Sequence, residues 1–78
     1  MSTHNELQEF LDEISAFKWL AEQAGAERPL VDEIEALKKL VETNGSAAWC
    51  QTAWRAQRRN DLVRLSLAAL HAYRMQQA

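Results

Sequence analysis

Apolar residues recur at intervals of three and four along most of the chain, and helix-breaking residues fall between these periodic stretches. The first stretch contains Leu7, Phe10, Leu11, Ile14, Phe17, Leu20, Ala21 and Ala24. At about 100° per residue these positions form one continuous arc, the pattern of an amphipathic helix that buries one face. Because the chain contains only two glycines and one proline, the pattern predicts an all-α protein.

Capping and turn residues set the expected helix boundaries. Thr3 to Glu6 fits a capping box, and Gly25 suits the position just after a helix. Pro29 suits the first turn of the next helix, whose apolar stripe contains Leu30, Ile34, Leu37 and Val41, flanked by Val31 and Leu40. The Asn44–Ser46 segment ends this helix, and Ser46 can cap the next one.

The C-terminal third carries two apolar sets that point in nearly opposite directions. Trp49, Cys50, Ala53 and Ala56 share one helix face, whereas the set from Leu62 to Tyr73 lies on the other. We expect the helix to break near Asn60, and the alternative is one straight helix with two partners. The expected architecture is a small bundle of three or four helices, at residues 5–24, 29–43, 47–59 and 61–76.

Residues 1–78 are long enough for one domain with a thin core. Cys50 is the only cysteine, so no disulfide forms within the chain, and we expect a buried, inert thiol in a reducing compartment. No signal peptide or membrane span is apparent, which predicts a cytoplasmic protein. The last helix is apolar over more than half its circumference, which predicts a homodimer. The expected interface residues are Leu62, Leu65, Ala69, Leu70 and Tyr73.

Charge is divided unevenly along the chain, whose net charge is −2. Nine of the acids, but only Lys18 and Arg28 among the bases, lie in residues 1–37. Seven bases, but only Glu42 and Asp61 among the acids, lie in residues 38–78. Such a division favours electrostatic attraction between the acidic and basic halves, either within one fold or between subunits.

Trp19 stands on the polar side of the first helix, opposite Phe10 and Phe17. An indole there exposes a large apolar area unless another chain covers it. We therefore predict a non-enzymatic regulatory or inhibitory adaptor that binds another protein, even one whose basic patch normally holds nucleic acid. The predicted contact residues are Trp19, Asp12, Gln23, Asp32, Glu33 and Glu35.

Residues 17–36 indicate an alternative to the adaptor function. Ala21 lies where two helices would pack closely, Gly25 lies at the turn, and Val31 and Ile34 are aliphatic in the second helix. In these residues the segment resembles the helix–turn–helix of phage-repressor-type DNA-binding domains, which implies a transcriptional regulator. A second possible contact with nucleic acid or an acidic partner is the arginine cluster Arg55, Arg58, Arg59 and Arg64.

Catalytic and metal-binding signatures are weak. The acid pairs Glu6–Glu9 and Asp32–Glu35 resemble those of Mg²⁺-dependent all-α nucleotide pyrophosphatases, which makes such an activity a remote alternative. His4, His71 and Cys50 do not have the spacing of a metal site, and no Ser–His–Asp set or glycine-rich phosphate loop is present. We therefore expect no catalytic residue, no metal and no cofactor.

Overall fold

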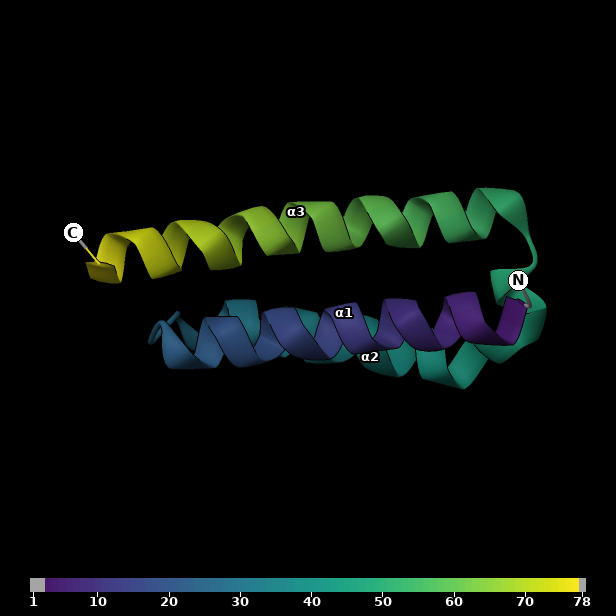
Figure 1. Cartoon of the computed structure of the whole chain (residues 1–78), viewed down its shortest axis with the longest axis horizontal. Helices are drawn as coiled ribbons and strands as arrows, with labels where there is room; N and C mark the ends of the chain where they lie inside the picture. Colours follow the sequence, from purple (N-terminus) through teal and green to yellow (C-terminus); the bar gives the residue numbers. More distant parts are fainter. Residues whose placement is uncertain (1–2, 78) are drawn as a thin grey trace.

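The chain forms an all-α bundle of three helices, which confirms the predicted fold class. The computed structural model describes the backbone of residues 3–77 and the side chains of residues 5–77, so the predicted cap by Thr3 lies outside the described side chains. The helices are α1 (Thr3–Gln23), α2 (Arg28–Trp49) and α3 (Thr52–Gln77). Figure 1 shows α1 and α2 running side by side in opposite directions, and α3 runs along them in the direction of α1. The bundle measures 41 × 23 × 17 Å.

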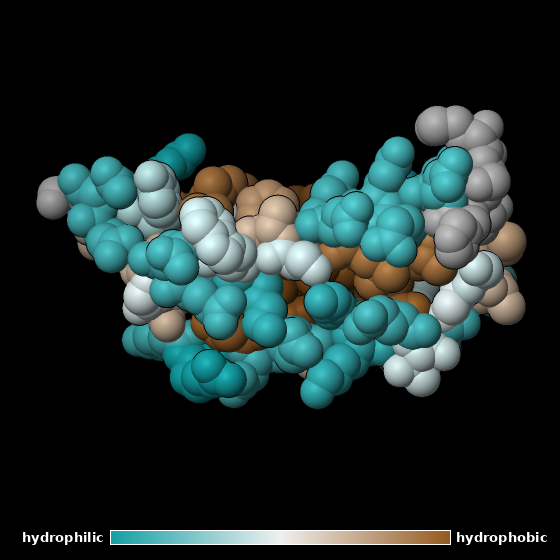
Figure 2. All heavy atoms as spheres, turned by 60° about the horizontal axis from the view of Figure 1, so that its bottom comes forward, coloured by the Kyte–Doolittle hydropathy of each residue, from teal (hydrophilic) through white to brown (hydrophobic). Residues whose placement is uncertain are grey.

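All three helices contribute side chains to one core. Ile14, Ile34, Val41, Trp49 and Ala69 are fully buried, and Phe10 contacts Trp49 with 4.9 Å between ring centroids. The view in Figure 2 shows hydrophobic atoms along a seam bordered by hydrophilic side chains. Burial of these apolar faces supplies the main driving force for folding. The core consists of Leu7, Phe10, Ile14, Ala21, Val31, Ile34, Leu37, Val41, Trp49, Leu62, Leu65 and Ala69.

Gly25 ends α1 as predicted. Its φ of 67° lies in the left-handed region, which glycine enters without steric cost. The amide of Gly25 donates to the carbonyl of Glu22 at 3.1 Å, and the amide of Ala26 donates to that of Ala21 at 3.0 Å. This pair of hydrogen bonds is a Schellman motif, which satisfies the last carbonyls of α1. Pro29 lies in the first turn of α2, where backbone N–H groups have no acceptor within the helix. Its missing N–H group therefore costs no helical hydrogen bond.

Gly45 interrupts α2 near its end, where the sequence predicted a boundary. Its φ of 66° and ψ of −161° are not helical, and α2 continues beyond it for one short turn. The amide of Cys50 donates to the carbonyl of Ser46 at 3.0 Å, which closes that turn. Trp49 follows the kink and is completely buried, so the change in direction at Gly45 brings the indole into the core.

The predicted break near Asn60 is wrong, because α3 continues without interruption from Thr52 to Gln77. The chain turns instead at Cys50 and Gln51. Trp49 is the only large apolar residue of the first predicted set, and it belongs to the last turn of α2. Cys50 is exposed rather than buried, as are Ala53 and Ala56. The two sets therefore do not compete for one core, and a straight α3 is compatible with the packing.

Candidate interaction surfaces

Trp19 projects from the face of α1 that points away from the core. Its side chain is 61% exposed, whereas Phe10 and Ile14 on the opposite face are buried. Asp12 and Gln23 are also exposed, one at each end of the same strip of surface. The Nε2 group of Gln8 donates to Oδ1 of Asp12 at 3.0 Å, which holds this carboxylate beside the helix. The surface predicted from the sequence is therefore present as an exposed indole with polar neighbours.

The three predicted contact acids of α2 already form ion pairs within the chain. Their partners are Arg28 for Asp32 at 3.0 Å, Arg64 for Glu33 at 3.1 Å, and Lys18 for Glu35 at 2.8 Å. The Glu33 pair joins α2 to α3, and the Glu35 pair joins α2 to α1. Exposed pairs of this kind contribute at most about 1 kcal/mol each to stability. Because each of these carboxylates is already paired with a cation of the same chain, it offers less charge to a partner than the sequence indicates.

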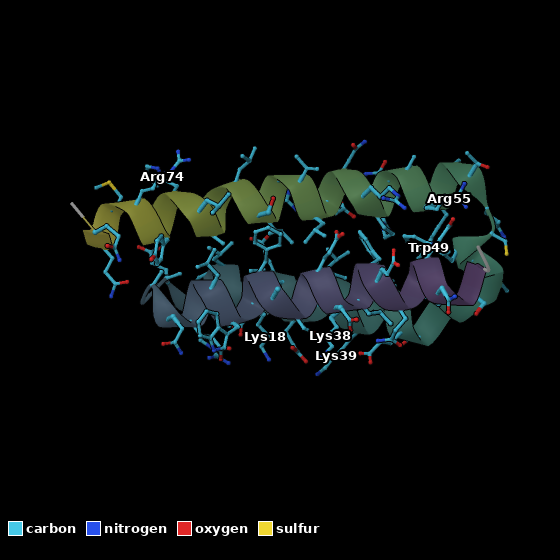
Figure 3. The ribbon with its side chains drawn as sticks, viewed as in Figure 1. Lys18, Lys38, Lys39, Trp49, Arg55 and Arg74 are labelled. Carbon is cyan, nitrogen blue, oxygen red and sulfur yellow. The ribbon has the colours of Figure 1, made fainter. Side chains whose placement is uncertain are left out.

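The Lys18–Glu35 pair shifts both ionisations toward the charged forms. The hydrogen bond from Lys18 lowers the pKa of Glu35 below its ordinary value, and the same bond raises the pKa of Lys18. Figure 3 shows Lys18, Lys38 and Lys39 on the same side of the bundle, where α1 and α2 lie together. Coulombic attraction to Lys38 and Lys39 lowers the pKa of Glu35 further.

Two of the four predicted arginines close the end of the bundle where α2 meets α3. Arg55 donates from Nη1 to the carbonyl of Trp49 at 3.1 Å, and Figure 3 shows both side chains at this end. The guanidinium of Arg59 stacks over Trp49 at 5.3 Å from the ring centroid and over Phe10 at 6.0 Å. Arg59 also borders a pocket with Glu6, Glu9 and Glu13. Both arginines therefore take part in packing.

The other two predicted arginines are also engaged within the chain. Nε of Arg58 lies 2.9 Å from Oδ2 of Asp61, and its guanidinium lies 5.3 Å from the centroid of Trp54. Arg64 points toward α2, where it binds Glu33. The structure thus distributes the four arginines over several neighbours and does not assemble them into one uncommitted basic patch.

The predicted dimer residues divide into two groups. Leu62, Leu65 and Ala69 are at most 5% exposed because α1 and α2 cover that face of α3, so they have no area left for a second subunit. Leu70 is half-buried, and Tyr73 is exposed. The interface predicted from all five residues therefore requires correction, since three of them form the chain's own core.

Sequence reasoning placed Val63 in one apolar set with the inward residues of α3, and it did not identify the exposed face of this helix. Val63 is 56% exposed, Leu67 is 62% exposed and Met75 is 64% exposed. Val63 and Leu67 are spaced by four residues and therefore share one face of the helix. That spacing could have indicated a separate exposed face, but the prediction combined Val63 with the adjacent inward residues into one broad apolar surface.

The helical hairpin determines where the remaining predicted features lie. The pairs Glu6–Glu9 and Asp32–Glu35 follow the starts of two antiparallel helices, so they lie toward opposite ends of the bundle. Among the side chains that the structure describes, no three His, Cys, Asp or Glu residues are grouped so as to hold a metal ion. Within residues 3–77, no helix has both the length and the apolar character needed to cross a membrane.

In the segment that resembles a helix–turn–helix, Ala21, Val31 and Ile34 are buried where α1 meets α2. The exposed positions of α2 next to them, Asp32 and Glu33, are acidic. The DNA-binding interpretation of this segment stays a prediction. Comparisons with family models, with curated proteins and with solved structures found no match.

Proposed function

We propose that this chain is a non-catalytic binding module, a small adaptor or inhibitor that docks on another protein through the outer face of α1. One observation carries the proposal: the Trp19 indole is 61% exposed on a helix whose opposite face packs into the core. Tryptophan is among the residues that contribute most binding energy at protein interfaces, and an indole has more apolar surface to bury than a smaller side chain. This residue therefore supplies the central contact.

The surroundings of Trp19 suit the polar rim of an interface. Ser15 and Gln23 lie one turn before and after it, and Glu22 lies three residues after it on the same face. Glu22 is exposed and forms no ion pair within the described part of the chain, unlike the acids of α2. The complementary partner surface would be an apolar socket with a basic rim, because opposite charges at the edge speed and orient association.

The test uses a photo-crosslinking amino acid at Ala16, which is exposed and lies three residues before Trp19 on α1. Crosslinking in cells that make the protein captures the partner, which is then purified for binding measurements. We expect Trp19→Ala to weaken binding by at least about tenfold, the loss typical of a central aromatic contact. The matched control is Tyr73→Ala, which removes an exposed aromatic residue from α3.

Equal affinity of wild type and Trp19→Ala for the captured partner would refute the proposal. Binding of random duplex DNA at low salt, with affinity falling steeply as salt rises, would instead favour the helix–turn–helix function. The two functions are thus separated by experiments on the same purified protein.

A further inference from the structure

The outer face of α3 carries a narrow apolar stripe that no other part of the described chain covers. Val63 and Leu67 are more than half exposed, and Leu70 follows at the next helical step on the edge of the same stripe. These intervals of four and three residues are the spacing of a seam that a second helix can occupy. Leu62, Leu65 and Ala69 form a separate inward stripe, so α3 has one face committed to the core and another left open.

The charged residues that α3 itself places along this open stripe are basic. Arg74 follows Leu67 at a helical spacing of seven residues and is exposed. Arg64 lies beside Val63; one of its N–H groups binds Glu33 of α2, and a guanidinium has further donors. The one acid of α3, Asp61, is held by Arg58 on the side that faces the other helices. Among the described residues of α3, no carboxylate lies on the open face.

We propose that the outer face of α3 is a second docking surface, and that its occupant is an acidic amphipathic helix of a partner protein. The partner's apolar residues would cover Val63 and Leu67, and its flanking glutamates or aspartates would pair with Arg64 and Arg74. An apolar seam with charged edges is a common way to bind a helix in a groove. This surface lies on a different helix from Trp19, so the inference does not depend on the docking role of α1.

A second copy of the chain fits this face less well. A symmetric pair of α3 helices would bring the arginines of both copies to one seam with no acids on that face to oppose them, and like charges at an interface cost affinity. Charge therefore favours a complementary acidic helix over self-association.

The test measures binding of two fluorescent helical peptides by anisotropy. Both peptides have leucine at the seam positions, and they differ only in carrying glutamate or lysine at the flanking positions. We expect the glutamate peptide to bind at least about tenfold more tightly than the lysine peptide, and the difference to shrink as salt screens the charges. Leu67→Asp should weaken binding of the glutamate peptide by at least about tenfold, because it places a carboxylate in the seam.

The matched control is Trp19→Asp, the same kind of change at an equally exposed apolar residue on α1. It should leave binding of the glutamate peptide unchanged, and circular dichroism should show that both variants remain helical. Unchanged binding of the glutamate peptide by Leu67→Asp would overturn the proposal. So would equal binding of the two peptides by Trp19→Asp, in which the α1 surface can no longer bind the lysine peptide. So would a wild-type dimer in ultracentrifugation that Leu67→Asp dissociates, since a second copy would then occupy the face.

Discussion

Replacing Trp49 tests how the closed end of the bundle is stabilised. The indole is completely buried, packs on Phe10 at 4.9 Å and lies under the guanidinium of Arg59. Truncation of a buried tryptophan to alanine costs about 3–5 kcal/mol, because packing is lost and a cavity remains. At about 0.05–0.15 kcal/mol per residue, a chain of 78 residues has a total stability of the same order. Trp49→Ala should therefore leave a large unfolded fraction.

Trp49→Phe separates packing from hydrogen bonding at the same position. The Nε1 group of Trp49 is buried and finds no hydrogen-bond acceptor among the described residues. Leaving a buried donor unpaired costs about 1–3 kcal/mol. Phenylalanine removes this donor while keeping an aromatic ring, and the lost volume costs about 1–3 kcal/mol in return. The two effects oppose each other, so Trp49→Phe should change stability by no more than about 2 kcal/mol in either direction, less than Trp49→Ala.

Urea unfolding followed by far-ultraviolet circular dichroism measures both variants, since tryptophan fluorescence would change with the substitution itself. Trp19→Ala is the control, because an exposed side chain should change stability by no more than about 0.5 kcal/mol. If Trp49→Phe proved as unstable as Trp49→Ala, the indole N–H would have to be satisfied in the folded state, and the reasoning would fail.

Two further predictions concern the kink in α2 and the ion pair between α1 and α2. Gly45→Ala should lower the free energy of unfolding by about 1–3 kcal/mol, because a φ of 66° with a ψ of −161° is a conformation essentially restricted to glycine, although the space around the residue is open. A neutral result in urea unfolding would show that the kink is dispensable. The lowered pKa of Glu35 means that its carboxylate stabilises the fold above the ordinary value of 4.5, and that this contribution is lost as pH falls through the folded-state pKa. The raised pKa of Lys18 means that its ammonium group stabilises the fold below pH 10.5. This stabilisation is lost as pH rises through the folded-state pKa. Glu35→Gln should therefore be less stable than wild type at neutral pH and equally stable in acid, and a deficit that persisted in acid would point to packing instead.

Much of the fold follows from local patterns in the sequence. The arc from Leu7 to Ala24 and the stripe of Leu30, Ile34, Leu37 and Val41 predicted the packed faces of α1 and α2, although Leu30 is only half-buried and the flanking Val31 is buried instead. Gly25 was identified as a helix end because the left-handed conformation there favours glycine. The exposure of Trp19 followed from the same helical geometry, since it lies opposite the buried arc.

The C-terminal third was harder to predict because its pattern depends on tertiary contacts. The prediction assigned Trp49 to the helix at residues 47–59. In the structure, the kink at Gly45 is followed by one last turn of α2, and Trp49 ends that turn. Without Trp49, the small residues Ala53 and Ala56 require no burial, so nothing forces a break at Asn60. The uses of the arginines could not be foreseen either, since they depend on aromatic rings and carboxylates that lie nearby only after folding.

The three tryptophans occupy three different environments, and this has a spectroscopic consequence. Trp49 is sealed in the core, Trp54 is half-buried beneath Arg58, and Trp19 is mostly exposed. Indole emission shifts to the red as solvent contact increases, so the three residues should emit at separable wavelengths. Variants that retain a single indole would report the core, the Arg58 stack or the α1 surface individually, without an added dye.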